Sequence, residues 1–345
     1  MFDRFVLRCD LVHRFRALGG TLVALCGMSA IAGWGTLSPL PCEQRPPVAK
    51  PTMWQAKSAV TRWRLPAPVY RTMAATVGDT AYVLGGLDPA GVTVANIDRF
   101  NPTTGIVGRA GQLAQATHGA WAVEFGGRVV VFGGASSYVY STIQSFDPRS
   151  DTTVLSGTLP SPRADLAVAA SGTTTVLLGG FNGYAPLNSV LVGHGTTGFH
   201  TFATLPVAVR YPAVVLQGHE VDLFGGLLAG GEYSGTFTAD IQQVDLATGR
   251  ARVIGHLPYP VAHAKATVLE GQIIVVGGST PSGPTADILR FDAATRAVSV
   301  VGRLPFALTD GALVRIQKRA YVLGGLSASA PLSQIEVIAL RRVVR

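Results

Sequence analysis

The sequence predicts an all-β protein, a six-bladed β-propeller, on three observations. A pair of glycines follows an apolar run six times, and successive pairs are 48, 46, 46, 52 and 47 residues apart. A leucine stands 20 residues before each pair, and a proline follows five of the six leucines. The chain contains 41 glycines, 21 prolines and only 14% charged residues, which suits short strands joined by tight turns rather than long helices.

The repeat extends from residue 58 to about residue 341. The glycine pairs are Gly85-Gly86, Gly133-Gly134, Gly179-Gly180, Gly225-Gly226, Gly277-Gly278 and Gly324-Gly325, and the leucines are Leu65, Leu113, Leu159, Leu205, Leu257 and Leu304. Self-similarity at a fixed period of this length is the signature of a repeat architecture, in which each repeat is one supersecondary unit.

Each unit contains four β-like runs. Residues 74–77 and 80–84 flank the short turn Gly78-Asp79, which predicts a hairpin. A polar loop after the glycine pair leads to a third run at residues 97–100, and a fourth run ends at the next leucine. Four antiparallel strands make one propeller blade.

The sixth unit is incomplete at its C-terminal end. It stops after its third strand, residues 335–340, whereas residues 59–64 form a fourth strand with no strands before it. We therefore expect the N-terminal strand to complete the last blade, which closes the ring and removes its open sheet edges.

These motifs resemble kelch repeats. The resemblance is carried by the apolar ends Tyr82-Val83-Leu84-Gly85-Gly86 and Tyr321-Val322-Leu323-Gly324-Gly325, by the Phe-Asn/Asp-Pro turns at Phe100 and Phe146, and by the period near 50 residues. The chain departs from the pattern in one respect, because the tryptophan common on kelch fourth strands occurs only as Trp63. The resemblance implies a six-bladed kelch propeller.

The N-terminal region predicts export. Basic residues up to Arg16 precede an uncharged run, residues 17–42, with an apolar centre at residues 18–31. We expect a signal peptide or a retained signal anchor over residues 1–37, a Pro-rich linker over 38–57 and the propeller over 58–345. The propeller would then be extracytoplasmic, either secreted or anchored to the cytoplasmic membrane by this one segment. The alternative is that the apolar run is a buried helix of the fold.

Several classes of function are disfavoured. The net charge of +8 is spread thinly, with no basic face and no reading module, so we expect no nucleic-acid partner. All three cysteines, Cys9, Cys26 and Cys42, precede the repeats, so the propeller has no thiol for metal binding or nucleophilic attack. No local spacing of His and Asp suggests a metal site, and no cofactor is predicted.

Polar residues recur at one position of the repeat. Six residues after each leucine stand Arg71, Gly119, Asp165, Tyr211, His263 and Asp310, called the ring residues below, with His118 and Arg210 one position earlier. Connections in an antiparallel meander alternate between the two ends of the sheet, so we expect these residues to surround the mouth of the central channel. Tyr138, Tyr140, Phe181, Tyr184 and Tyr233 lie on loops of the same face.

This pattern has a functional and a structural interpretation. Donors, acceptors and an aromatic face suit a sugar or a carboxylate, whereas polar residues at strand starts also cap backbone groups or hold channel water. The first hypothesis is a binding module for a glycan, a small polar ligand or a protein. The alternative is a small-sugar isomerase or mutarotase, resembling exported sialic-acid-processing kelch propellers, with its acid and base drawn from Asp165, His263 and Asp310. A peptide-binding kelch module inside the cytoplasm is the third hypothesis, which the export segment disfavours.

Overall fold

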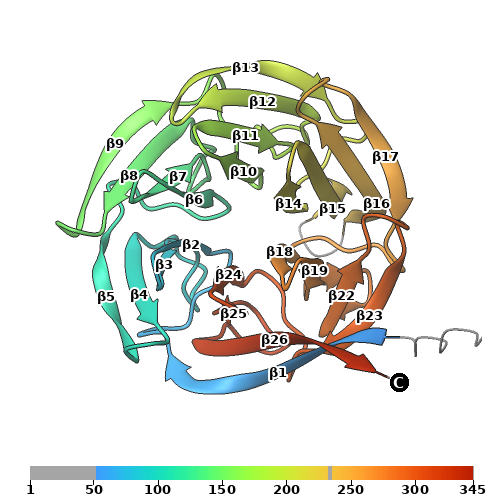
Figure 1. Ribbon diagram of the computed structural model, residues 1–345. Helices are drawn as coiled ribbons and strands as arrows, with labels where there is room; N and C mark the ends of the chain where they lie inside the picture. Colours follow the sequence, from blue (N-terminus) through green and yellow to red (C-terminus); the bar gives the residue numbers. More distant parts are fainter. Residues whose placement is uncertain (1–51, 232–234, 345) are drawn as a thin grey trace, which may run out of the picture. The chain divides into compact units, whose positions relative to one another are not determined.

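The computed structural model describes residues 52–231 and 235–344, and these form a six-bladed β-propeller (Figure 1). Six four-stranded antiparallel sheets surround a central channel, and no helix occurs in the described part of the chain. The fold predicted from the repeats is confirmed. The predicted export segment, all three cysteines and most of the predicted linker lie outside the described residues, and residues 52–231 and 235–344 include no helix that could span a membrane.

The first three blades follow one another along the chain. Blade one contains β2 (Met73–Val77), β3 (Thr80–Leu84), β4 (Asn96–Asn101) and β5 (Ile106–Gln112). Blade two contains β6 (Trp121–Phe125), β7 (Arg128–Phe132), β8 (Thr142–Asp147) and β9 (Thr152–Thr158). Blade three contains β10 (Ala167–Ser171), β11 (Thr174–Leu178), β12 (Ser189–His194) and β13 (Thr197–Thr204).

The last three blades complete the ring. Blade four contains β14 (Ala213–Gln217), β15 (Glu220–Ala229), β16 (Thr236–Asp245) and β17 (Ala251–His256). Blade five contains β18 (Lys265–Leu269), β19 (Gln272–Val276), β22 (Asp287–Phe291) and β23 (Val298–Arg303), with the short ribbon β20 (Ser279–Thr280) and β21 (Gly283–Pro284) in its loop. Blade six contains β24 (Ala312–Ile316), β25 (Arg319–Leu323), β26 (Gln334–Val344) and β1 (Thr52–Arg64).

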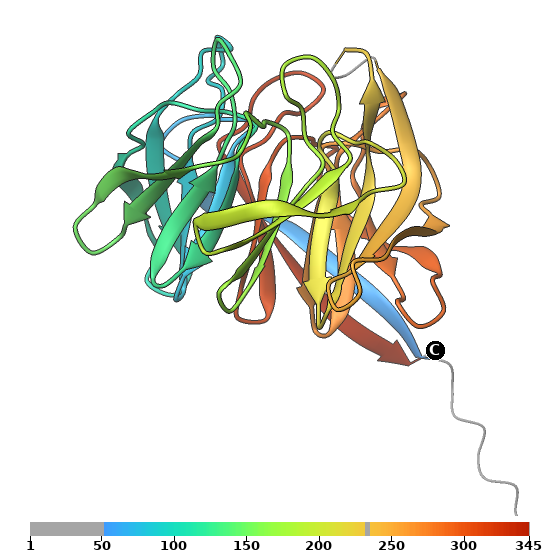
Figure 2. The same cartoon turned by 90° about the horizontal axis from the view of Figure 1, so that it is seen from above.

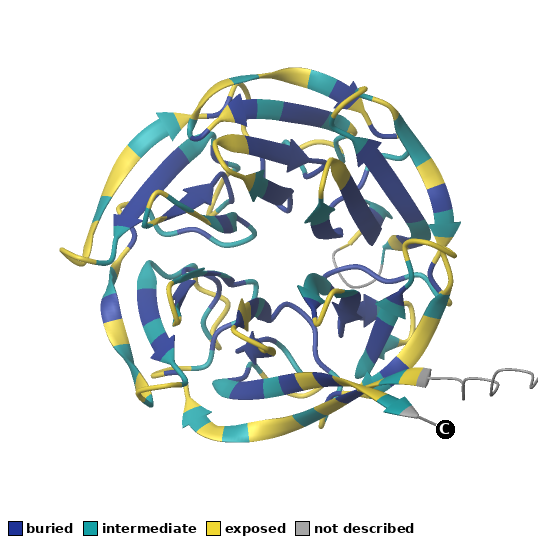
Figure 3. Cartoon of the chain, viewed as in Figure 1, coloured by how far each residue is buried: buried dark blue, intermediate teal, exposed yellow. Residues whose placement is uncertain are grey.

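The hydrophobic core lies between the blades, where apolar faces of adjacent sheets pack together. Inner strands are mostly buried and outer strands carry most of the exposed residues (Figure 3). The aromatic residues of the repeat motif pack across blade boundaries. Phe146 of blade two contacts Tyr82 of blade one at a centroid distance of 5.4 Å, and Phe100 of blade one contacts Tyr321 of blade six at 5.2 Å. The periodic aromatic positions therefore join neighbouring blades.

The glycine pairs join the blades through the backbone. The N–H of the second glycine donates to a carbonyl in the loop that enters the next blade, for example Gly134 to Arg163 at 2.9 Å and Gly325 to Val69 at 2.8 Å. A Cβ on the first glycine, such as Gly133, would overlap that same carbonyl oxygen. Glycine permits this close approach because it has no Cβ. Both positions also have positive φ, which glycine adopts without strain. The recurring pair is thus a contact between blades.

The predicted closure by the N-terminal strand is confirmed, and the strand is longer than expected. β1 pairs antiparallel with β26 as the outermost strand of blade six (Figure 1), and both run together to the C-terminal end of the chain (Figure 2). β1 begins at Thr52, six residues before residue 58, so the last part of the predicted linker belongs to the propeller. β1 is longer than predicted because its partner strand is also longer. β26 continues to Val344, beyond the predicted end at residue 340, and pairs with the first residues of β1.

Candidate functional site at the channel mouth

The six ring residues occupy the same backbone position in every blade. Each has a positive φ between 50° and 60°, and the inner strand of its blade begins two residues later. The residue before it bridges the residue after the glycine pair, as His118 bridges Ala135. The left-handed conformation costs roughly 1–2 kcal/mol for a residue with a Cβ, so the fold holds five strained residues at one end of the channel. Strain of this kind is often retained at functional sites.

Backbone hydrogen bonds connect ring residues of successive blades. The N–H of Asp165 donates to the carbonyl of Gly119 at 2.6 Å, that of Tyr211 to Asp165 at 2.7 Å, and that of His263 to Tyr211 at 3.1 Å. Each bond joins one blade to the blade before it. The left-handed residues are therefore placed by neighbouring blades, which explains why one register position brings them together around the channel.

Asp165 is the centre of a buried ion-pair cluster. Its Oδ1 accepts a hydrogen bond from Nη2 of Arg71 at 3.1 Å, and its Oδ2 accepts bonds from Nη2 and Nε of Arg210 at 2.6 and 3.0 Å. Both arginines also donate to the hydroxyl of Tyr211. Only 2% of the Asp165 side chain is exposed, and the arginine side chains are 7% and 10% exposed. Charge-assisted bonds that are this well desolvated hold the side chains in one arrangement.

Gly119 makes this cluster possible from the one ring position that has no side chain. A Cβ at Gly119 would lie 2.5 Å from Oδ1 of Asp165 and 3.3 Å from Nη2 of Arg71. Arg71 in blade one therefore reaches over blade two to pair with Asp165 in blade three. The ion pair therefore requires glycine at this position, whereas the positive φ alone does not, because the other five ring residues adopt it with a Cβ.

His263 and Asp310 form a second pair on the other side of Tyr211. Nδ1 of His263 lies 2.7 Å from Oδ1 of Asp310, and both side chains are buried. The imidazole stacks on the Tyr211 ring at a centroid distance of 3.8 Å. The carboxylate of Asp310 orients the imidazole, an arrangement that general acids and bases use as well as structural histidines.

His118 lies at the edge of this cluster. Its Nδ1 is 2.9 Å from the hydroxyl of Thr93 on the loop after the first glycine pair. Burial and the nearby charge of Arg71 lower the pKa of His118 to about 4, against the opposite effect of Asp165. His118 is therefore neutral at pH 7 and offers a hydrogen-bonding group without charge.

Lys265 is a site residue that the sequence analysis missed. It opens β18, two residues after His263, and lines the cavity below the ring together with Arg71, Asp165 and Asp310. Its Nζ lies 4.6 Å from the centre of the Trp121 ring. Burial lowers the pKa of Lys265, although the charges of Asp310 and Asp165 oppose the shift. The repeat did contain a sequence signal for this residue, because Lys265 is the one charged residue at a position that is apolar in the other five blades. The equivalent first residues of the other inner strands are Met73, Trp121, Ala167, Ala213 and Ala312.

The predicted aromatic residues on the loops divide into exposed and buried ones. Tyr138 is 65% exposed and Tyr184 is 94% exposed, on loops of blades two and three. Tyr140 is buried and packs edge-on against Tyr138. Phe181 lies beneath Arg210, whose Cζ is 4.0 Å from the ring centre. Tyr233 lies outside the described residues.

The structure thus brings together all of the predicted polar site residues at one end of the channel. Arg71, Asp165, Arg210 and Tyr211 form one cluster, His263 and Asp310 form the second, and His118 lies at the edge. Within residues 52–231 and 235–344, no group of three or more His, Cys, Asp or Glu side chains is placed to hold a metal ion. The arrangement can bind an anion through its cations and can orient one imidazole for proton transfer.

The fold and this ring define a six-bladed β-propeller with a polar channel mouth, and comparison with known proteins agrees with that class. The solved structure of YjhT matches with a TM-score of 0.69 over 81% of this chain and 99% of the other, at 15% sequence identity, which establishes the fold alone. No family model matches the chain.

Two curated proteins share a short stretch of sequence. The N-acetylneuraminate epimerases of Brucella suis and Brucella melitensis are each 35% identical over 95 residues. The match covers 25% of this chain and 24% of each relative, so it spans about a quarter of their length.

Proposed function

We propose that the channel mouth binds a small acidic sugar, a monosaccharide that carries a carboxylate. The observation that carries the proposal is the charge of the site. Three cationic side chains, Arg71, Arg210 and Lys265, converge with only two carboxylates, Asp165 and Asp310. A desolvated site with one excess positive charge is complemented by one ligand carboxylate.

The neutral groups of the site suit the rest of a sugar. The hydroxyl of Tyr211 and the imidazole of His118 can exchange hydrogen bonds with ligand hydroxyls. Tyr138 and Tyr184 expose aromatic surfaces on loops of adjacent blades. The short match to proteins named N-acetylneuraminate epimerase supports this ligand class, because N-acetylneuraminate is itself a carboxylated sugar.

Asp165 and a ligand carboxylate can be bound by the same arginines. Each guanidinium has five N–H donors in a planar fork, so one arginine can serve two acceptors. The ligand would share Arg71 and Arg210 with Asp165 and would approach Lys265 from the channel mouth. An anionic ligand favours the charged form of Lys265, so binding should raise the pKa of Lys265.

The charge requirement can be tested by calorimetry. We expect N-acetylneuraminate to bind more tightly than its methyl ester, which keeps the sugar and removes the negative charge. Lys265→Met should weaken binding of the acid by about 10- to 100-fold, because a charged hydrogen bond is lost, and should change ester binding far less. Lys57→Met, an exposed substitution on β1, is the matched control. Equal affinity for the acid and the ester would refute the proposal.

An isomerase is the second candidate, favoured by the pair of His263 and Asp310. Nδ1 of His263 lies 2.7 Å from the carboxylate of Asp310, the orientation in which an imidazole acts as acid or base. In that case the protein should accelerate the interconversion of N-acetylneuraminate anomers measured by proton NMR. His263→Gln and Asp310→Asn should each reduce the acceleration by about 100-fold or more. If the anomers interconvert at the uncatalysed rate while the wild-type site is saturated with ligand, the isomerase is wrong and the binding function alone is retained.

A further inference from the structure

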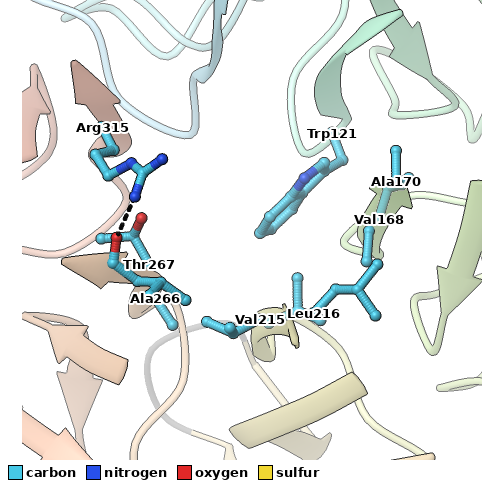
Figure 4. A pocket seen from close by; sticks show the side chains of 11 residues that line it. Trp121, Val168, Ala170, Val215, Leu216, Ala266, Thr267 and Arg315 are labelled. Atoms are coloured by element: carbon cyan, nitrogen blue, oxygen red, sulfur yellow. Dashed lines mark hydrogen bonds between the residues drawn. The ribbon is translucent and has the colours of Figure 1, made fainter. Parts of the chain in front are cut away.

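The central channel contains a second cavity, farther from the ring residues than the cavity at the channel mouth. The inner strands run from the ring to the hairpin turns, and the cavity is lined by the middle residues of β10, β14 and β18. Its volume is about 340 Å³, within the range of small-molecule sites. Figure 4 shows the indole of Trp121 projecting into it from blade two, with Arg315 on the opposite side. We call this cavity the far chamber.

The walls of the far chamber are apolar side chains and strand edges. Val168, Ala170, Leu216 and Ala266 are among the side chains that line it. The inner strand of each blade pairs on one side only, so its other edge turns N–H and C=O groups toward the channel. A ligand in this chamber is therefore offered an apolar surface with backbone donors and acceptors between the side chains.

The charge in the far chamber is all positive. Arg315 is exposed and is the single charged residue among those that line the chamber. Its Nη1 donates one long hydrogen bond of 3.4 Å to the carbonyl of Val268, and it forms no ion pair with any residue of the described ranges. An arginine fork with unused donors at the edge of an apolar cavity is suited to a carboxylate.

Trp121 lies between the far chamber and the site at the channel mouth, and both cavities share it. Trp121 lines both cavities, whereas Lys265 lines the cavity at the ring and does not line the far chamber. The indole therefore offers a flat apolar surface to a ligand in the far chamber, while the Lys265 ammonium lies 4.6 Å from the centre of the same ring.

We propose that the far chamber binds a small organic carboxylate, with its apolar body against Trp121 and its carboxylate at Arg315. The site is distinct from the channel mouth, and its ligand would enter from the opposite face of the propeller. The proposal does not depend on the acidic-sugar function.

Phenylacetate and 2-phenylethanol are suitable probes, because they share the aromatic body and differ in charge. We expect phenylacetate to change the tryptophan fluorescence on binding and to bind about 10-fold or more tightly than the alcohol. Arg315→Met should abolish this preference, whereas Arg319→Met, an exposed substitution on β25, should retain it. Ala170→Leu, which fills part of the chamber, should weaken both probes.

Three outcomes would overturn the proposal. One is equal affinity of the wild-type protein for the two probes, and another is unchanged phenylacetate affinity in Arg315→Met. Loss of phenylacetate binding in Lys265→Met but not in Arg315→Met would place the probe at the channel mouth and would also overturn it. Binding of N-acetylneuraminate should be the same in Arg315→Met and wild type, so failure of either proposal is seen separately.

Discussion

Replacing Glu336 with glutamine is expected to stabilise the propeller by on the order of 3–5 kcal/mol at pH 8 and to have little effect below pH 4. Glu336 lies on β26 and is 1% exposed. Neither of its carboxylate oxygens has a hydrogen-bond partner among the described residues. Burial raises the pKa of Glu336 from 4.5 to about 8. A buried carboxylate without a partner is among the most destabilising groups a core can hold.

The direction of the pH dependence follows from the raised pKa. Below pH 4.5 the group is protonated in both the folded and the unfolded chain, and it opposes folding least. Between pH 4.5 and about 8 the unfolded chain releases this proton and the folded chain retains it, so the free energy of unfolding falls as the pH rises. Glutamine has nearly the shape of the protonated acid and does not titrate. The free energy of unfolding of the glutamine variant should therefore not fall with pH on account of this position.

The repeat itself indicates that glutamine fits this position. Glu336 pairs across the sheet with the residue that stands two positions before the first glycine of its pair. Gln144 in blade two and Gln242 in blade four pair with the equivalent residue of their own blades. Each amide bonds both backbone groups of a residue in the loop entering its blade. Gln144 accepts from the N–H of Gln115 at 2.8 Å and donates to its carbonyl at 2.9 Å. A protonated Glu336 can imitate this pattern, and a glutamine can form it at every pH.

Thermal unfolding between pH 4 and pH 9 measures the effect. The melting temperature of wild type should decline toward alkaline pH more steeply than that of Glu336→Gln. Glu270→Gln, the same change in an exposed turn, should follow wild type. Parallel pH profiles for wild type and Glu336→Gln would show that the carboxyl is solvated in the folded protein, contrary to the expectation.

The fold was predictable because the strongest sequence signals are contacts between blades. Each glycine pair permits a backbone hydrogen bond to the next blade, and Phe146 packs on an aromatic residue of the preceding blade. These requirements are the same in every blade, so they repeat along the sequence. The start of β1 was not predictable in the same way, since residues 52–55 are paired only by the extension of β26 beyond residue 340 and carry no repeat signal.

The candidate site was predictable in position but not in pairing. A constant interval from the leucine places the ring residues at one backbone position, which repeat counting can find. The pairing of these side chains depends on their length and direction across the channel, which the repeat does not give. Arg71, for example, extends past Gly119 to contact Asp165. Lys265 was not predictable from the ring position, because it lies two residues after it, where the other five blades carry an apolar residue.

Removing β1 is expected to have the largest effect of any change considered, because the strand closes the ring. β1 covers the edge of β26 along its length, from Thr52 opposite Val344 to Arg64 opposite Gln334. Ala56 is buried in the core between blades five and six, and the half-buried Trp54 and Trp63 pack on either side of blade six. Each tryptophan contributes on the order of 2 kcal/mol by burial, so loss of the strand should remove about 5 kcal/mol or more.

The experiment compares a chain of residues 65–345 with one of residues 52–345, which retains the whole of β1. The shorter chain should aggregate or melt about 10–20 °C lower, since each kcal/mol shifts the melting temperature of a domain of this size by about 2–4 °C. A synthetic peptide of residues 52–64 should restore part of the lost stability in proportion to its concentration, because it binds only the folded ring. Equal melting temperatures of the two chains would contradict closure by β1. A loss of stability that the peptide cannot reverse would indicate that the strand must be covalently attached for blade six to form.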